Sequence, residues 1–251
     1  MKSIPILIAG PCVIESDSVM CTVAEKLVEI SDSGKFDVYF KASFDKANRT
    51  SCHSYRGPGL VDGLNALVRI KEKYGLRIVT DIHEAWQASP IAEVADIIQI
   101  PAFLCRQTDL IQSAARTEKI VNIKKGQFMS GLDMSFAVEK ARAVGSNRVF
   151  VTERGNSFGY NNLVVDFRNV SIMKDFADAV IMDCTHSVQR PSAGLGVSGG
   201  DPQYIKAMAE AGKAFGADGY FFEVHPNPQN SRSDSNCMLD LSIIDTILQN
   251  L

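Results

Sequence analysis

A loop rich in hydrogen-bond donors follows the short apolar run 36–40. It extends from Lys41 to Gly59, and its single acidic residue is Asp45. Ammonium groups, guanidinium groups and hydroxyls in one loop repel cations and bind phosphate groups. Most basic loops are solvated faces, but the mixture of charged and neutral donors predicts a site for a multiply charged anion. The donors are Lys41, Lys46, Asn48, Arg49, Thr50 and Arg56.

Short apolar runs alternate with amphipathic segments along all 251 residues. In the segment after the first run, Val19, Val23 and Leu27 share one helical face. Eight such strand-then-helix units predict a single (β/α)8 TIM barrel domain over residues 1–251. The main alternative is an open doubly wound sheet, but no glycine-rich dinucleotide fingerprint follows any run. The runs are 4–9, 37–40, 76–80, 97–100, 120–123, 148–151, 179–182 and 219–222.

Composition restricts the class of protein. The formal net charge of -3 argues against general nucleic-acid binding and favours small anionic ligands. The six cysteines are scattered without a CxxC motif, which is typical of reduced thiols in the cytosol. The apolar run near the N-terminus is too short to span a membrane. We therefore expect a cytoplasmic protein with neither nucleic-acid nor membrane partners.

Polar or ionisable side chains follow every predicted strand. In a barrel of this class the active site lies at the carboxyl ends of the strands. A purely structural barrel has no need for such groups there, so their recurrence favours an enzyme. The strand-end residues, in chain order, are Cys12, Lys41, Asp81, His83, Gln99, Lys124, Lys125, Glu153, Arg154, Asp183, His186, Glu223 and His225.

One subset of these residues has the chemistry of a metal site. The last strand of a closed barrel lies between the first and the seventh, so Cys12, His186 and Glu223 should converge. Thiolate, imidazole and carboxylate together suit Zn2+, Fe2+ or Mn2+, and Asp234 could provide a fourth ligand. Taken singly, a buried cysteine or histidine is more often structural. Their joint placement favours the metal site.

A second subset is cationic and exceeds what one phosphate group requires. Two phosphorylated substrates, or a phosphate with a carboxylate, would account for it. A strand-end lysine also admits a Schiff-base aldolase with Lys41 or Lys124 as nucleophile. The Gly/Ser-rich segment 187–200 is either a set of turns or a lid that excludes water. The cationic residues are Lys41, Lys46, Arg49, Lys124 and Arg154, with Arg106 nearby in sequence.

Several motifs together carry a family resemblance over essentially the whole chain. The most specific is Lys46-Ala-Asn-Arg-Thr50 continuing to Tyr55-Arg-Gly-Pro58. With them the sequence closely resembles the 3-deoxy-D-manno-octulosonate 8-phosphate synthases. The other matching segments are 10–15, 100–104, 124–127, 152–155, 183–188 and 222–226.

The resemblance implies condensation of phosphoenolpyruvate with D-arabinose 5-phosphate and water, with release of inorganic phosphate. The product would enter lipopolysaccharide synthesis, and the enzyme would be a homotetramer. The resemblance also implies the binding residues. Lys124 and Arg154 would hold the phosphoenolpyruvate phosphate. Lys41, Lys46 and Gln99 would surround its carboxylate and enol, while Asn48, Arg49 and Thr50 would bind the sugar phosphate, Arg49 and Thr50 from a neighbouring subunit.

The resemblance further implies the metal-dependent subclass, because the metal-independent members have asparagine where this chain has Cys12. The implied metal ligands are Cys12, His186, Glu223 and Asp234, and Asp81 and His83 are candidates for proton transfer. Three rival functions remain. They are a sister heptulosonate phosphate synthase that uses erythrose 4-phosphate, a lysine-dependent aldolase, and a catalytically inert phosphosugar-binding barrel.

Overall fold

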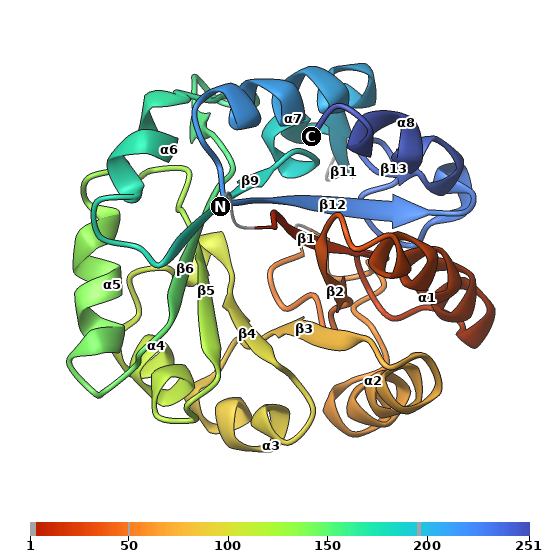
Figure 1. Ribbon diagram of the computed structural model, residues 1–251, viewed down its shortest axis with the longest axis horizontal. Helices are drawn as coiled ribbons and strands as arrows, with labels where there is room; N and C mark the ends of the chain where they lie inside the picture. The colour runs from red at the N-terminus through yellow and green to blue at the C-terminus, as the bar shows by residue number, and fades with distance from the viewer. Residues whose placement is uncertain (1–3, 50, 195–196) are drawn as a thin grey trace.

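Eight parallel strands close into a barrel at the centre of the molecule, with helices around them (Figure 1). The computed structural model describes residues 4–49, 51–194 and 197–251. The order is β1-β2-β3-β4-β5-β6-β9-β12, and β12 pairs back with β1. The predicted TIM barrel is therefore confirmed. The strands are β1 Ile6–Gly10, β2 Asp37–Lys41, β3 Arg77–Asp81, β4 Ile97–Ile100, β5 Ile120–Lys124, β6 Val149–Glu153, β9 Ala179–Asp183 and β12 Gly219–His225.

Helices cover the outside of this barrel, and they are formed by the amphipathic segments of the sequence. Ser16 caps the first helix by accepting a hydrogen bond from the Val19 amide. A turn after Ser130 precedes the helix that starts at Met134. The helices are α1 Asp17–Asp32, α2 Leu60–Tyr74, α3 Ala88–Ala92, α4 Thr108–Ala115, α5 Met134–Arg142, α6 Arg168–Met173, α7 Ile205–Ala214 and α8 Ile244–Leu248.

Shorter elements lie in the loops between these units. The Gly/Ser-rich segment forms an antiparallel hairpin, β10 Gln189–Gly194 with β11 Val197–Gly200. No helix in the described part of the chain has the length and apolar character that a bilayer span requires. The remaining short strands are β7 Asn156–Ser157, β8 Leu163–Val164 and β13 Leu239–Asp240, and the 3-10 helices are η1 Ala85–Gln87, η2 Ala102–Leu104, η3 His186–Val188, η4 Pro202–Tyr204, η5 Pro228–Asn230 and η6 Leu241–Ile243.

The hydrophobic core has two parts. The larger part packs the barrel against the helices, with Val23, Leu27 and Leu67 fully buried there. The smaller part fills the interior of the barrel towards the amino ends of its strands. This apolar plug closes one end of the barrel and leaves the other end for polar residues. Its members are Ile8, Tyr39, Val79, Ile97, Ile120, Phe150, Ala179, Ile181 and Phe221.

The polar end of the barrel follows from the strand pleat and register. Two residues beyond Tyr39, Val79 and Ile97, the same strand face carries a polar group instead of an apolar one. These polar residues are Lys41, Asp81 and Gln99. Asp81 is the register partner of Gln99, and Gln99 is the partner of Asn122, so these side chains form one row. The register therefore brings together residues that are far apart in the chain.

Glycine at the end of β1 permits a close approach to β2. A Cβ at Gly10 would overlap the carbonyl oxygen of Lys41. Gly10 is also the register partner of Glu223, so the chain emerges from β1 beside the end of β12. This explains how Cys12 reaches the region of Glu223 as the strand order predicted.

Candidate active site

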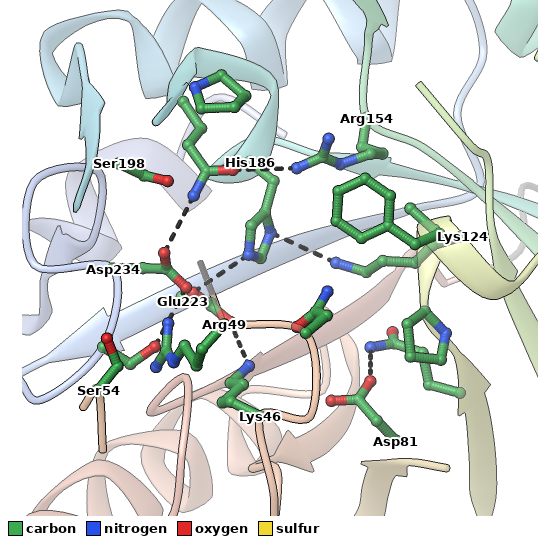
Figure 2. A pocket seen from close by; sticks show the side chains of 18 of the residues that line it. Lys46, Arg49, Ser54, Asp81, Lys124, Arg154, His186, Ser198, Glu223 and Asp234 are labelled. Atoms are coloured by element: carbon green, nitrogen blue, oxygen red, sulfur yellow. Dashed lines mark hydrogen bonds and ion pairs between the residues drawn. The ribbon is translucent and has the colours of Figure 1, made fainter. Parts of the chain in front are cut away.

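A cavity of about 380 Å³ opens above the polar end of the barrel (Figure 2). Twelve of the fourteen residues that the resemblance assigns to substrate binding, metal binding or proton transfer line it. Cys12 is fully buried and is not in the wall, and Thr50 lies outside the described residues. The predicted residues in the wall are Lys41, Lys46, Asn48, Arg49, Asp81, His83, Gln99, Lys124, Arg154, His186, Glu223 and Asp234.

Asp81 is held in place on the cavity floor by three neighbouring side chains. The Ser43 hydroxyl donates to Asp81 Oδ2 and accepts from Lys41 Nζ at 2.8 Å, while Gln99 Nε2 donates to Asp81 Oδ1. Lys41 Nζ is 3.4 Å from Asp81 Oδ2. Burial alone would raise the pKa of Asp81, but the Lys41 and Lys46 ammonium groups outweigh it and lower that pKa well below its usual value. Asp81 is therefore a fixed carboxylate.

His83 presents a neutral imidazole to the same floor. Burial lowers the pKa of His83, and the nearby Asp81 carboxylate opposes that shift only in part. Its Nδ1 atom is buried and has no hydrogen-bond partner among the described residues. The ring packs edge-on against Phe44 with centroids 5.8 Å apart. A neutral ring with a free nitrogen suits the predicted role in proton transfer.

Lys124 lies at the centre of a contact between β5 and β9. Its Nζ is 2.5 Å from Asp183 Oδ2 and 3.4 Å from His186 Nδ1, and it lies 3.6 Å from the centroid of the Phe221 ring. Burial lowers the pKa of Lys124, while Asp183 acts in the opposite direction. The Asp183 contact holds the ammonium group in a fixed place at the cavity wall.

Three of the four predicted metal ligands lie close together. The ligand atoms of Cys12, Glu223 and Asp234 all lie within 4.8 Å of one another. Glu223 is fully buried, yet neither carboxylate oxygen has a hydrogen-bond partner in the described chain. Burial and then the Glu223 charge raise the pKa of the Cys12 thiol, so a divalent cation would be needed to favour its thiolate. This donor set fits a transition-metal ion.

His186 lies beside this trio. Its Nε2 is 3.4 Å from Glu223 Oε2, and its Nδ1 is 2.7 Å from Asp183 Oδ2. A carboxylate on one ring nitrogen leaves the other nitrogen free, as in carboxylate–histidine–metal arrangements. The side chains of His186, Glu223 and Asp234 face one another in Figure 2. The predicted fourth ligand is thus oriented towards Glu223 and Asp234.

Asp234 adopts an unusual backbone conformation, with φ of 49°. Its Oδ2 accepts hydrogen bonds from the Cys12 thiol at 3.1 Å and the Ser233 hydroxyl at 3.2 Å. Its Oδ1 accepts one from Gln189 Nε2 at 3.0 Å. Positive φ is uncommon for non-glycine residues and concentrates at functional sites. These hydrogen bonds and the positive φ place the Asp234 carboxylate beside Cys12.

Arg49 and Arg154 line the cavity with guanidinium groups that are partly buried and incompletely bonded. Arg49 Nε donates to the carbonyl of Tyr55 at 3.3 Å, and Arg154 Nη2 donates to Gln189 Oε1 at 3.2 Å. Arg49 Nη2 and Arg154 Nη1 are buried without a partner in the described chain. In Figure 2 the two arginines lie on opposite sides of the His186 ring. Each has a free donor for an anion.

Two strand-end residues, Lys125 and Glu153, pair with each other behind the cavity and do not line it. The Lys125 ammonium is fully buried, 3.3 Å from Glu153 Oε1, and it donates to Asn156 Oδ1 at 2.7 Å. It also reaches the carbonyl of Gly155 at 3.3 Å. This lysine joins the loops after β5 and β6. Likewise Arg56, from the donor-rich loop, donates from Nε to Asp45 at 2.8 Å and is outside the wall.

Sequence reasoning did not assign four residues that support this site. Ser43 bridges Lys41 and Asp81, and Ser233 contacts the Cys12 sulfur at 2.7 Å. Asp183 was noted at a strand end without a role, although its spacing of three residues from His186 was a usable signal. No sequence signal marked Asn122, because an asparagine in the middle of a buried strand resembles any core amide whose hydrogen bonds are satisfied.

The fold and site define a phosphate-handling TIM-barrel class, and the chain belongs to the DAHP synthetase I family, whose profile matches residues 3–251. More specific are full-length relatives named 2-dehydro-3-deoxyphosphooctonate aldolase. That of Campylobacter jejuni strain 81-176 is 51% identical, covering 98% of this chain and 94% of its own length. That of Helicobacter hepaticus is 52% identical over 98% and 95%. The Fusobacterium nucleatum protein is 52% identical over 97% and 88%.

Proposed function

We propose that this chain condenses phosphoenolpyruvate with D-arabinose 5-phosphate and water to give 3-deoxy-D-manno-octulosonate 8-phosphate and inorganic phosphate. The observation that carries the proposal is a cavity with free guanidinium donors of Arg154 and Arg49 on opposite sides of the His186, Glu223 and Asp234 cluster. Two separated anion sites match two phosphorylated substrates. The full-length relatives named as octonate aldolases support the same activity and favour it over the heptulosonate rival.

Phosphoenolpyruvate occupies the floor in this proposal. Lys124 and Arg154 bind its phosphate, since both cations line the cavity next to each other around His186. Lys41 and Lys46 lie 3.7 Å from the same Glu223 oxygen, where they meet the substrate carboxylate and the enol oxygen. Fixed cations at these positions stabilise the negative charge of the substrate without reorganisation during the reaction.

The covalent steps follow from this placement. C3 of phosphoenolpyruvate attacks the aldehyde carbon and forms the new carbon–carbon bond. Water adds to C2, and the bond between C2 and the phosphate oxygen then breaks to release inorganic phosphate. The new alkoxide takes up a proton, and the attacking water loses one. His83, with its free Nδ1 and lowered pKa, is the proposed proton carrier.

A divalent metal ion completes the proposed site, held by Cys12, His186, Glu223 and Asp234. Such an ion supplies Lewis-acid polarisation of an oxygen or a more acidic bound water. Both carboxylate oxygens of buried Glu223 lack a hydrogen-bond partner in the described chain, and Lys46 Nζ at 3.7 Å is too far away to donate one. The unpartnered oxygens support binding of a cation here. Zn2+, Fe2+ and Mn2+ all suit the donor set.

The sugar phosphate occupies the rim. Asn48 and Arg49 bind it together with Thr50, and Arg49 offers the buried free Nη2 donor. Arg49 lines the cavity of its own chain, and we assign it to that cavity, whereas the family resemblance implies that Arg49 and Thr50 of the homotetramer serve a neighbouring subunit. Mixing subunits decides between the two: an Arg49→Met protomer and a His186→Ala protomer, each impaired alone, would recover activity as hybrids only if the arginine acts in trans.

Phosphate release from phosphoenolpyruvate tests the proposed reaction. We expect turnover with D-arabinose 5-phosphate and not with erythrose 4-phosphate, loss of turnover after chelation, and recovery when Mn2+ or Zn2+ is added. Turnover only with erythrose 4-phosphate would place the chain with the heptulosonate synthases. Full activity after thorough chelation would retain the reaction but make Cys12 and its partners structural.

Borohydride separates the remaining enzymatic rival. The lowered pKa of Lys124 is one property of a Schiff-base lysine, but its 2.5 Å contact with Asp183 opposes that shift and favours the ammonium form over the neutral nucleophile. We therefore expect no reductive trapping of either substrate. Covalent modification of Lys41 or Lys124 under these conditions would favour the lysine-dependent aldolase.

A further inference from the structure

Arg232 is a cation at the cavity rim to which the function above gives no role. It follows η5 in the loop between β12 and β13, and it lines the cavity. Its backbone is fixed, because the Arg232 amide and the Ser231 hydroxyl both donate to Glu15 Oε1, at 3.2 and 3.0 Å. Its exposed guanidinium makes neither a hydrogen bond nor an ion pair with the described residues.

A tyrosine joins Arg232 to Arg49. The Arg232 guanidinium lies 4.8 Å from the centroid of the Tyr55 ring, and the Tyr55 hydroxyl is anchored on the carbonyl of Ile14 at 3.0 Å. The carbonyl of the same tyrosine accepts from Arg49 Nε at 3.3 Å. One residue thus positions two arginines that come from different loops, and both line the same cavity.

The cations of the cavity floor and of its rim differ in whether they have acidic partners, and this difference favours an anionic ligand at the rim. The floor lysines Lys41 and Lys124 have carboxylate partners at 3.4 and 2.5 Å, in Asp81 and Asp183. Within the described chain, neither Arg49 nor Arg232 has an acidic partner. A phosphate dianion carries the charge and the acceptor oxygens that two free guanidinium groups match.

We propose that Arg232 is a specificity-determining residue that binds the terminal phosphate of the sugar phosphate together with Arg49. The proposal rests on the proposed function, because that function supplies the phosphorylated aldehyde. The Tyr55 ring contacts the Arg232 guanidinium and the Tyr55 carbonyl holds Arg49, so one residue links both cations of the proposed phosphate site. Arg232 therefore selects a substrate that carries a phosphate at the end away from the aldehyde.

Steady-state kinetics of Arg232→Met test this role, since methionine keeps an apolar stem without the charge. We expect kcat/KM for D-arabinose 5-phosphate to fall by about tenfold to a hundredfold, as for a lost charged hydrogen bond. The KM for phosphoenolpyruvate should stay within about twofold. Arg232→Lys should recover part of the loss, because it restores the charge without the fork.

The phosphate-free sugar D-arabinose separates recognition from a structural effect. At high concentration it should react equally with wild type and with Arg232→Met, since it has no phosphate to lose contact with. Equal losses for both sugars, or an unchanged KM for D-arabinose 5-phosphate, would overturn the proposal. The matched control is Arg69→Met, an exposed arginine of α2 that pairs with Asp17 at 2.9 Å and should change neither constant.

If wild type turned over neither sugar phosphate, the proposed function itself would fail. Calorimetric titration with D-arabinose 5-phosphate then still tests the arginine. Binding to wild type and weaker binding to Arg232→Met would support the phosphate site, and equal binding to both would overturn it.

Discussion

The floor and the rim of the cavity are built on opposite principles. On the floor, the lysines from strand ends are buried and their charges are paired, as in Lys124 with Asp183 and Lys41 with Asp81. At the rim, Arg49 and Arg232 come from loops and have no acidic partner in the described chain. The difference indicates that the floor is organised before a ligand arrives, whereas the rim is completed by the ligand.

Physical chemistry explains why the two regions differ. Buried charges are costly unless they are paired, so a floor of buried lysines requires buried acids in fixed positions. Such fixed charges are what a reacting centre needs. A partly exposed guanidinium costs little to leave unpaired, and it binds a phosphate without first breaking an internal ion pair. The rim can therefore select a substrate at small cost to stability.

The largest effect should come from removing a metal ligand on the floor. We expect Cys12→Ala to weaken Zn2+ or Mn2+ binding by about a hundredfold or more, since even outer contacts of metal sites are worth about tenfold to a hundredfold. Metal content after gel filtration and titration with a competing chelator provide the measurement. Turnover should fall in parallel and recover in excess metal.

Cys184→Ala is the matched control for this substitution. Cys184 is also fully buried and directly follows a barrel strand, but its thiol donates to the carbonyl of Met182 at 3.5 Å and does not line the cavity. Its metal content and activity should match wild type. Equal metal loss in both variants would mean that the cysteines act through folding, and unchanged metal in Cys12→Ala would contradict its assignment.

A smaller effect should separate the two arginines with free donors. Arg154→Met should raise the KM for phosphoenolpyruvate by about tenfold to a hundredfold, because it removes a charged hydrogen bond to that phosphate. Arg49→Met should raise the KM for the sugar phosphate by a similar factor. Initial rates with each substrate varied in turn provide the measurement. Equal effects of one variant on both substrates would contradict the division between floor and rim.

The floor was largely predictable from sequence. Each barrel strand is a short apolar run, and in a closed parallel barrel all carboxyl ends face one cavity, so the polar residues after the runs had to converge. This logic placed Lys41, Asp81 and Glu223 correctly. The same logic wrongly included Lys125 among the cavity residues. Lys124 faces the cavity, whereas the adjacent Lys125 is buried among the loops behind it. Adjacent residues at a strand end point in opposite directions.

The rim was less predictable, because loop conformation depends on contacts that periodicity does not encode. Asp234 was expected as a metal ligand, but nothing in sequence indicated the positive φ that directs it to Cys12. The glycine-rich segment expected as a lid or as turns forms the β10–β11 hairpin. Arg232 was assigned no role from sequence, since its tyrosine partner is far away in the chain. Thr50 lies outside the described residues.

The smallest predicted effect concerns the row of amides that supports Asp81 on the floor. Asn122 Nδ2 donates to Gln99 Oε1 at 3.0 Å, and the Thr152 hydroxyl donates to Asn122 Oδ1 at 2.8 Å. The hydroxyl therefore fixes which way both amides face. Thr152→Val should lower the free energy of unfolding by about 1–3 kcal/mol, because it leaves a buried carbonyl oxygen without a donor.

Thr80→Val is the matched control for that row. It shows whether the Thr152 hydroxyl stabilises the protein by orienting the amides or only by packing. Thr80 is equally buried in β3, but its hydroxyl has no partner in the described chain, so valine there should be neutral or stabilising in urea denaturation. Thr152→Val should also lower kcat a few-fold, since Gln99 is then free to turn away from Asp81. Equal stability losses in the two variants would mean that the hydroxyl contributes only packing. The floor would then owe its order to the ion pairs alone.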